Sequence, residues 1–235
     1  MPNKKLLLEK YRTNPCANAR QEGLFPEMMK TIGHLTLYLA EADLRRTVPL
    51  ILWNEFWLER SQFPENHTRY KRGRLIYADL GAFNIGSETS YRHPCLILYE
   101  GRNWALVAPM TSKKYGDPVA LHYDLPPTYR LDTPSTLQLD AIKVIDKRRI
   151  LGYFYTKDQY EAMRDLNDPA PPAEATIIDK KDLDAIDELL ARHYAPSLHK
   201  QLMHARYRQE QLELENQWLR QELLNLYGRL PQAIK

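Results

Sequence analysis

A chain of 235 residues is longer than one small domain requires and shorter than two large ones. Its hydrophobic share of 43% and charged share of 27% are typical of a folded protein, which excludes global disorder and collagen-like repeats. The net charge of +3 conceals an asymmetry, because residues 68–155 hold 13 basic and 8 acidic side chains. Any anion-binding surface is therefore expected in the middle of the chain.

Residues 1–66 are expected to form a helical N-terminal extension. Two apolar rows recur at helical spacing between residues 26 and 61: Met29, Ile32, Leu35 and Leu39, then Leu50, Trp53 and Trp57. Pro49 suits the first turn of the second helix. The apolar faces are expected to cover each other or the central domain.

Nothing in this extension predicts a membrane segment or a secretory signal. Five charged residues interrupt residues 35–57, and the first 12 residues hold three leucines among lysines and a glutamate. Cys16 and Cys95 lie far apart and outside any metal-binding spacing. We expect a cytoplasmic protein with reduced thiols, without a metal or other cofactor.

The middle part, residues 67–167, predicts a small β domain. Six of the nine glycines fall between residues 73 and 152. Short runs rich in branched and aromatic residues alternate with turn residues, and the expected strands are 75–80, 95–99, 104–110, 119–125 and 137–145. Strands of this length and spacing are typical of a small barrel or sandwich.

The C-terminal part predicts helices joined by a stiff linker. A short helix at 157–166 closes the β domain, and a proline-rich linker follows at 168–178. Residues 179–235 are expected to form two helices, one over 179–194 and a longer one with Ser197 as N-cap.

The last helix carries a heptad pattern. One row holds Leu198, Ala205, Leu212, Leu219 and Leu226, and the other, offset by four, holds Leu202, Gln209, Asn216, Leu223 and Leu230. One asparagine at an a position favours a parallel two-stranded coil, so a homodimer through this helix is expected. The alternative is a helix packed back on its own chain, since Gln209 is polar and Leu214 and Trp218 lie off the seam.

Five short motifs follow one another over about residues 70–166 of the central block: Arg72-Gly73, Gly86-Ser87-Glu88, His93-Pro94, Pro109-Met110-Thr111-Ser112 and Ile145-Asp146-Lys147. In this order and spacing the block resembles the MazF/PemK (Kid) family of toxin endoribonucleases. The resemblance implies an α+β protein with an SH3-like barrel, here with flanking helices and a long coiled-coil-like C-terminal helix. It also implies a homodimer that an antitoxin protein neutralises.

The activity that the resemblance implies is metal-independent cleavage of single-stranded RNA, usually mRNA. The ribose 2′-hydroxyl attacks the adjacent phosphate and leaves a 2′,3′-cyclic phosphate and a 5′-hydroxyl. Such chemistry needs a base, an acid and donors or cations on the phosphate oxygens.

Thr111 matches the catalytic threonine of the family, whereas His93 stands where the family has arginine. Histidine titrates near neutrality and can act as general acid or base, but it is a weaker permanent charge. We therefore assign His93 to proton transfer, Thr111 to a hydrogen bond on the phosphate, and Arg92 or Lys113 to charge support.

Other candidates follow the family's polar positions. Asp140 is expected to assist catalysis, although an inward-facing structural role is an alternative. The remaining expected RNA contacts are Ser87, Glu88, Ser112, Lys113, Lys114, Gln138 and Lys143. For the loop and lysine positions the alternatives are ordinary turn residues and solvated side chains.

Two other functions stay open from the sequence. The replacement of the family arginine and the helical appendages would also suit a non-catalytic SH3-like module that binds nucleic acid or protein in a larger assembly. A toxin that poisons a protein such as gyrase is the third possibility, because the same barrel occurs there. Cleavage of RNA in excess EDTA would separate these functions.

Overall fold

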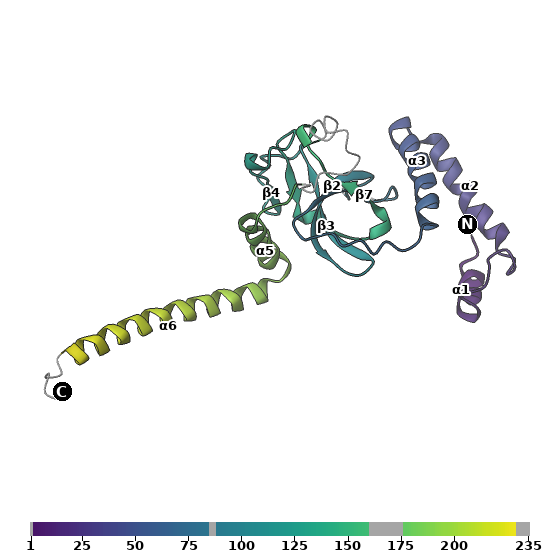
Figure 1. Ribbon diagram of the computed structural model, residues 1–235. Coiled ribbons are helices and arrows are strands. Elements are labelled where there is room, and N and C mark those ends of the chain that lie inside the picture. Colours follow the sequence, from purple (N-terminus) through teal and green to yellow (C-terminus); the bar gives the residue numbers. More distant parts are fainter. Residues whose placement is uncertain (1, 85–87, 160–175, 229–235) are drawn as a thin grey trace. The chain divides into compact units, whose positions relative to one another are not determined.

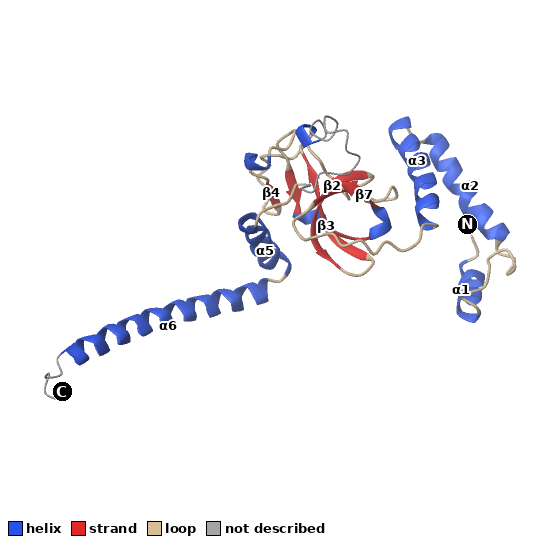
Figure 2. Ribbon diagram, viewed as in Figure 1, coloured by secondary structure: helices blue, strands red, loops and turns tan. Residues whose placement is uncertain are grey.

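A computed structural model describes residues 2–84, 88–159 and 176–228 of the chain. It combines helices with an antiparallel sheet (Figures 1 and 2). The chain forms two compact units, one of Met1–Asn66 and Asp79–Arg92, the other of His67–Ala78 and His93–Lys235.

The first unit holds three helices, α1 (Lys4–Thr13), α2 (Phe25–Glu41) and α3 (Leu44–Ser61). The expected pair corresponds to α2 and α3, whereas α1 was not predicted because it has so few apolar residues. Pro49 lies inside α3 and not in its first turn, which corrects the prediction. The reason is that the Asp43 side chain accepts a hydrogen bond from Arg46 N–H and starts the helix earlier.

The sheet belongs mainly to the second unit, and its printed strand pairs are antiparallel. Its strands are β1 (Leu75–Asp79), β2 (Arg92–Glu100), β3 (Trp104–Thr111), β4 (His122–Asp124), β5 (Thr136–Gln138), β6 (Lys143–Asp146) and β7 (Ile150–Tyr153). The strand order is β4-β5-β3-β2-β1-β7, and β6 pairs with β3 beside β5. β4 and β7 stand at the two ends of this order, so the closed barrel is not confirmed.

Two of the expected strands differ from the structure. The run 119–125 contributes only β4, and the run 137–145 is divided by a 3₁₀ turn at Leu139–Ala141. The strands before and after this turn pair with different parts of β3. β5 pairs with Met110 and Thr111 of β3, whereas β6 pairs with its residues 104–107. β7 was not predicted, because a strand of four residues carries little periodicity.

One hydrophobic cluster of the second unit lies on one face of the sheet. Its buried members come from β1, β2, β3, the β4–β5 region and the segments after the sheet: Leu75, Leu96, Leu98, Ala108, Met110, Leu125, Leu137, Leu139, Phe154, Ile178 and Ile186. Side chains alternate between the two faces of a strand, so residues 93, 95 and 97 point to the opposite face from Leu96 and Leu98. This second face is also buried at Cys95, Ile97 and Val107, and it carries the polar residues considered below.

Helix α5 (Lys180–Tyr194) completes that core. Ile186 is fully buried, and the buried carboxylate of Asp182 accepts hydrogen bonds from the hydroxyls of Tyr123 and Tyr129. Burial and this carboxylate raise the pKa of both tyrosines, so they stay protonated donors. Tyr194 adds a hydrogen bond from its hydroxyl to the carbonyl of Leu139.

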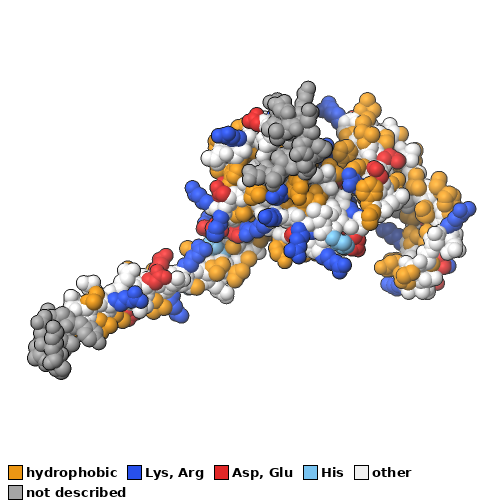
Figure 3. All heavy atoms as spheres, viewed as in Figure 1, with side chains coloured by type: hydrophobic (Ala, Val, Ile, Leu, Met, Phe, Trp, Pro, Cys, Tyr) orange, Lys and Arg blue, Asp and Glu red, His pale blue; other side chains and the backbone are white. Residues whose placement is uncertain are grey.

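Helix α6 (Pro196–Gly228) contains almost the whole heptad pattern. It starts at Pro196, so Ser197 lies in its first turn and is not the N-cap, because the His199 N–H already bonds to Ala195 O. Its large apolar side chains are exposed (Figure 3). The pairing of two such helices is not confirmed.

Three expectations fall partly or wholly outside the described residues: most of the helix at 157–166, most of the linker at 168–178, and Leu230. Within the ranges that the structure describes, no helix combines the length and apolar character needed to cross a membrane.

Candidate functional site

A row of polar residues crosses four strands on the face of the sheet opposite the core. β2 and β3 pair Cys95 with Pro109, and extending this register by two residues sets His93 opposite Thr111. Thr111 is paired in turn with Thr136, and Thr136 with Asp124. Residues directly opposite in antiparallel strands lie about 4.5–5.5 Å apart and share a face. If the register continues unchanged past Cys95 and Pro109, the two predicted catalytic residues are cross-strand neighbours.

The hydroxyl of Thr111 is oriented by its own loop. Its oxygen accepts a hydrogen bond from the backbone N–H of Lys113 at 3.3 Å. A hydroxyl has one hydrogen to donate, and accepting a bond leaves that hydrogen available. Thr111 is half-buried, so its hydroxyl can donate to a group that approaches from solvent.

The loop after Thr111 is held by the far end of the row. The Thr136 hydroxyl lies against the Asp124 carboxylate and 3.5 Å from Lys114 O, and Asp124 accepts from the Gly116 N–H at 3.0 Å. Thr136 is fully buried, which makes this anchor rigid. Ser112 and Lys113 are exposed on the loop, and Lys114 is half-buried.

A second row runs beside the first on the same face and ends at a buried histidine. Gln138 on β5 is paired with His122 on β4. The His122 side chain is 3% exposed, and its Nε2 lies 3.5 Å from Oδ2 of Asp140, whose side chain is 41% exposed. Neither ring nitrogen completes a hydrogen bond within the described part of the chain. Asp140 thus connects a buried imidazole to the surface.

Gln138 and Lys143 are less accessible than expected for RNA contacts. Gln138 is 5% exposed, and Lys143, paired with Val107, is half-buried. Gln138 therefore lies below the surface on which Asp140 is exposed, and its burial favours a supporting role.

The loop before His93 belongs to the first unit, where Trp53 of α3 contacts it. The Trp53 indole N–H donates to the buried Asp79 carboxylate at 2.8 Å, and the Trp53 and Tyr91 rings meet edge to face at 5.4 Å. Tyr91 has a φ of 66°, a left-handed conformation that is rare for a bulky residue and that this packing supports. Glu88 and Arg92 are exposed at this loop.

Arg92 and His93 are neighbours on an extended strand, so their side chains point to opposite faces of the sheet. A single phosphate group therefore cannot readily contact both side chains. Ser87 lies outside the described residues.

The thiol next to the site is inert. Cys95 is fully buried, and burial raises the pKa of its thiol, which keeps it protonated and non-nucleophilic. Across residues 2–84, 88–159 and 176–228, groups of three His, Cys, Asp or Glu side chains that could hold a metal ion are absent.

His122, Asp124 and Thr136 were not predicted from the sequence as parts of this site. A signal was present, because His122 and Asp124, like Thr136 and Gln138, are polar residues two apart in short strands. Such spacing indicates a shared face but does not say which strands meet there.

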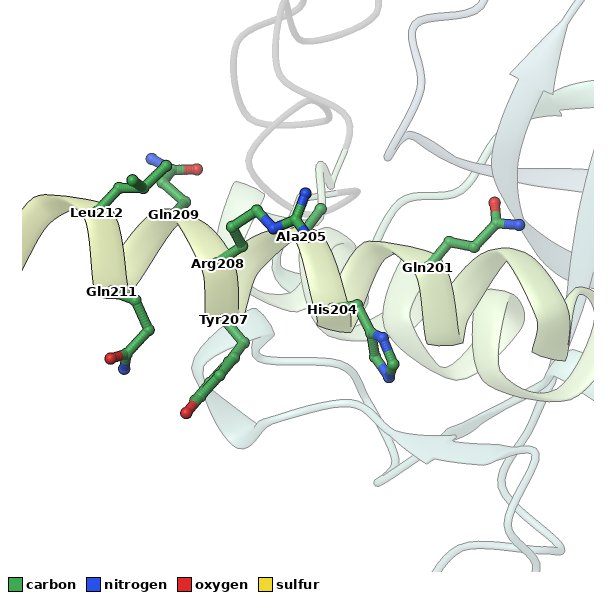
Figure 4. A pocket seen from close by; sticks show the side chains of 8 residues that line it. All are labelled: Gln201, His204, Ala205, Tyr207, Arg208, Gln209, Gln211 and Leu212. Atoms are coloured by element: carbon green, nitrogen blue, oxygen red, sulfur yellow. The ribbon is translucent and has the colours of Figure 1, made fainter.

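A hollow on α6 is not a comparable site. Its eight described lining residues, from Gln201 to Leu212, all belong to one stretch of this helix (Figure 4). In the close-up, Tyr207 and Gln211 point away from Gln209 and Leu212. The side chains do not converge on a common point, as a binding site for a small molecule requires.

A family match covers the residues of this site. Residues 71–168 match the family described as PemK-like, MazF-like toxin of type II toxin-antitoxin system. The match covers less than half of the chain, and His93, Thr111 and Asp140 lie within it.

Two solved structures of MazF from Deinococcus radiodurans are similar to the chain. The first, a crystal structure of MazF (Form-I), has 15% identity and a TM-score of 0.38, over 53% of this chain and 94% of that one. The second, of MazE-MazF (Form-II), has 19% identity and a TM-score of 0.28, over 41% and 91%. Both TM-scores are below 0.5, and neither similarity defines the fold here. No curated protein matches the sequence.

Proposed function

We propose that the matched domain is an endoribonuclease toxin that cleaves single-stranded RNA without a metal ion. The 2′-oxygen forms a bond to phosphorus while the bond from phosphorus to the 5′-oxygen breaks. The products are a 2′,3′-cyclic phosphate and a 5′-hydroxyl. Because DNA lacks the 2′-hydroxyl, RNA is the substrate.

Proton transfer is assigned to His93 and Asp140. One group must accept the 2′ proton and another must deliver a proton to the leaving 5′-oxygen. An imidazole near neutrality suits either role. Asp140, backed by the buried ring of His122, is the second group.

Thr111 and a nearby basic side chain are assigned to contact the phosphate oxygens. The Thr111 hydroxyl donates to a phosphate oxygen, and Lys113, with Arg92 as the alternative, supplies positive charge as the phosphate becomes more negative. Glu88, Ser87, Ser112 and Lys114 are proposed as outer RNA contacts.

One observation supports this proposal: the β2–β3 register pairs Cys95 with Pro109, and its continuation by two residues would bring His93 opposite Thr111. A pair about 4.5–5.5 Å apart can reach one phosphodiester linkage, whereas residues on opposite faces could not.

The test is incubation of the full chain with single-stranded RNA in excess EDTA, followed by analysis of the new ends. We expect cyclic phosphate and 5′-hydroxyl ends, a loss of at least about 100-fold for His93→Ala, and a smaller loss for Thr111→Val. His193→Ala is the matched control, because His193 is an exposed histidine on α5. Equal activity of His93→Ala and the control would refute the assignment.

The assembly is part of the proposal. We propose that the sheet closes as an SH3-like barrel, that an antitoxin covers the site, and that two copies pair through α6. In that pairing Arg208 faces Glu213 of the second copy and Glu215 faces Arg220, and both pairs attract. Cleavage of mRNA places the protein in the cytoplasm.

The alternative is a non-catalytic binding module. The presence of His93 in place of the family arginine favours it, and RNA binding without cleavage in the same assay would establish it.

A further inference from the structure

A cationic hollow lies outside the site described above, at the tip of the β2–β3 hairpin. It has a volume of about 650 Å³ and is lined by His67, Arg69, Glu100, Gly101, Arg102 and Lys147. All six belong to the second unit. A hollow of this size accommodates one nucleotide.

The floor of the hollow is a rigid, internally neutral ion pair. Lys147 is 1% exposed and donates to Glu100 at 2.7 Å and to the carbonyl of Thr68 at 2.8 Å. Glu100 also accepts from the Tyr70 N–H at 2.8 Å. Burial alone would raise the pKa of Glu100, but these hydrogen bonds hold it below its ordinary value, so the carboxylate stays charged.

The rim is different, because it adds two positive charges, one of which, that of Arg69, also acts electrostatically on Glu100. Arg69 and Arg102 are exposed and form no ion pair within the described residues, whereas nearby Arg148 is paired with Asp146 at 2.9 Å. Since the floor neutralises itself, the two guanidinium groups leave the hollow with an excess of positive charge. Structural ion pairing does not account for these two arginines.

The hollow lies at the other end of the strands that carry the proposed site. His93 is the second residue of β2, and Glu100, seven residues further, ends the strand, so the two are roughly 23 Å apart along extended backbone. A polyanion held at His93 and Thr111 can therefore follow the hairpin to its tip. In the view of Figure 3, Lys and Arg side chains gather along the lower side of the sheet-bearing region.

We infer that this hollow is a second binding site for single-stranded RNA, which holds a backbone phosphate away from the cleaved linkage. The inference rests on the proposed function for the identity of the ligand. Arginine suits the role because its planar group donates two parallel hydrogen bonds to a phosphate. The site extends the RNA footprint and takes no part in bond breaking.

The test compares RNA lengths in the full chain by fluorescence anisotropy. The probes are 2′-fluoro RNAs of about 20 and about 4 nucleotides, which resist cleavage because they lack the 2′-hydroxyl. Arg69→Ala/Arg102→Ala is compared with Lys180→Ala/Arg192→Ala, which removes the same charge from exposed positions on α5. Unchanged circular dichroism and melting temperature confirm folding.

The rim variant is expected to bind the long RNA about tenfold more weakly and the short RNA as the unchanged chain does. Its slope of log affinity against log salt falls by about 1.4, the value for two lost phosphate contacts. The α5 variant keeps both the affinity and the slope.

Equal weakening in both variants, or no weakening of long-RNA binding, overturns the inference. The inference is also overturned if the rim variant binds RNA normally but no longer binds a poly-glutamate peptide, since the hollow would then be a site for acidic peptides. If the long RNA depends on the rim but ordinary RNA is not cleaved, the endoribonuclease proposal fails and the second site stands. A full chain that binds no long RNA overturns both.

Discussion

Strand β3 and helix α6 are both rich in apolar residues, but they differ in how far these side chains are buried. Ala108 and Met110 of β3 are 0% and 2% exposed, because both belong to the hydrophobic cluster that neighbouring strands and α5 complete. Leu212, Leu219 and Leu223 of α6 are 52%, 44% and 53% exposed. The apolar side chains of the strand pack against other residues of the same chain, whereas those of the helix form a regular row that is exposed to solvent. An apolar stripe of this kind is stable when a second surface covers it.

The largest effect is expected in the core. Leu137→Ala should lower the free energy of unfolding by about 2–5 kcal/mol, because Leu137 is fully buried and the lost side chain leaves a cavity. Leu214→Ala on α6 should change it by less than about 0.5 kcal/mol. Urea denaturation of the full chain measures both. Similar losses would mean that α6 packs on the core.

The proposed seam is the second target. Leu219→Lys should convert a two-copy species to a single chain in light scattering, because a charge at this position cannot be buried between two helices. Leu214→Lys is the control, since Leu214 is 59% exposed but lies off the seam. A single-chain mass for the unchanged protein, or equal effects of the two variants, would rule out the α6 pairing.

A third variant examines how α5 joins the core. Asp182→Asn keeps the shape but removes the charge that the hydroxyls of Tyr123 and Tyr129 contact. We expect a loss of about 1–2 kcal/mol in unfolding free energy. Asp184→Asn, which removes an exposed pair with Lys180, should cost less than about 0.5 kcal/mol. If the two losses match, the buried carboxylate does not stabilise the docking of α5.

The smallest effect concerns a surface ion pair and its pH dependence. Hydrogen bonds from Arg148 lower the pKa of Asp146 below its ordinary 3.8. A lowered pKa means that the pair stabilises the fold above pH 3.8 and loses this contribution as the pH falls through the folded-state value. Asp146→Asn should therefore reduce the melting temperature slightly at pH 7 and not at pH 2. A difference that persists at pH 2 would point to a cause other than charge.

Local patterns predicted the helices best. The helix at 179–194 is confirmed as α5, and Asp179 caps it by accepting from the Asp182 N–H, because capping and helical periodicity are encoded within a few residues. The strands were harder. The run 137–145 has the composition of one strand, but the turn at Leu139–Ala141 divides it between two parts of β3.

By itself the amino-acid sequence determined the order of helical and β segments, the heptad row of α6 and the residue types, His93, Thr111 and Asp140, that suit RNA chemistry. Only the tertiary structure decided that Thr136 and Asp124 continue the row from Thr111 and that a buried His122 lies behind Asp140. The physical reason is that strand register joins residues far apart in the chain. No local propensity specifies which of them share a face.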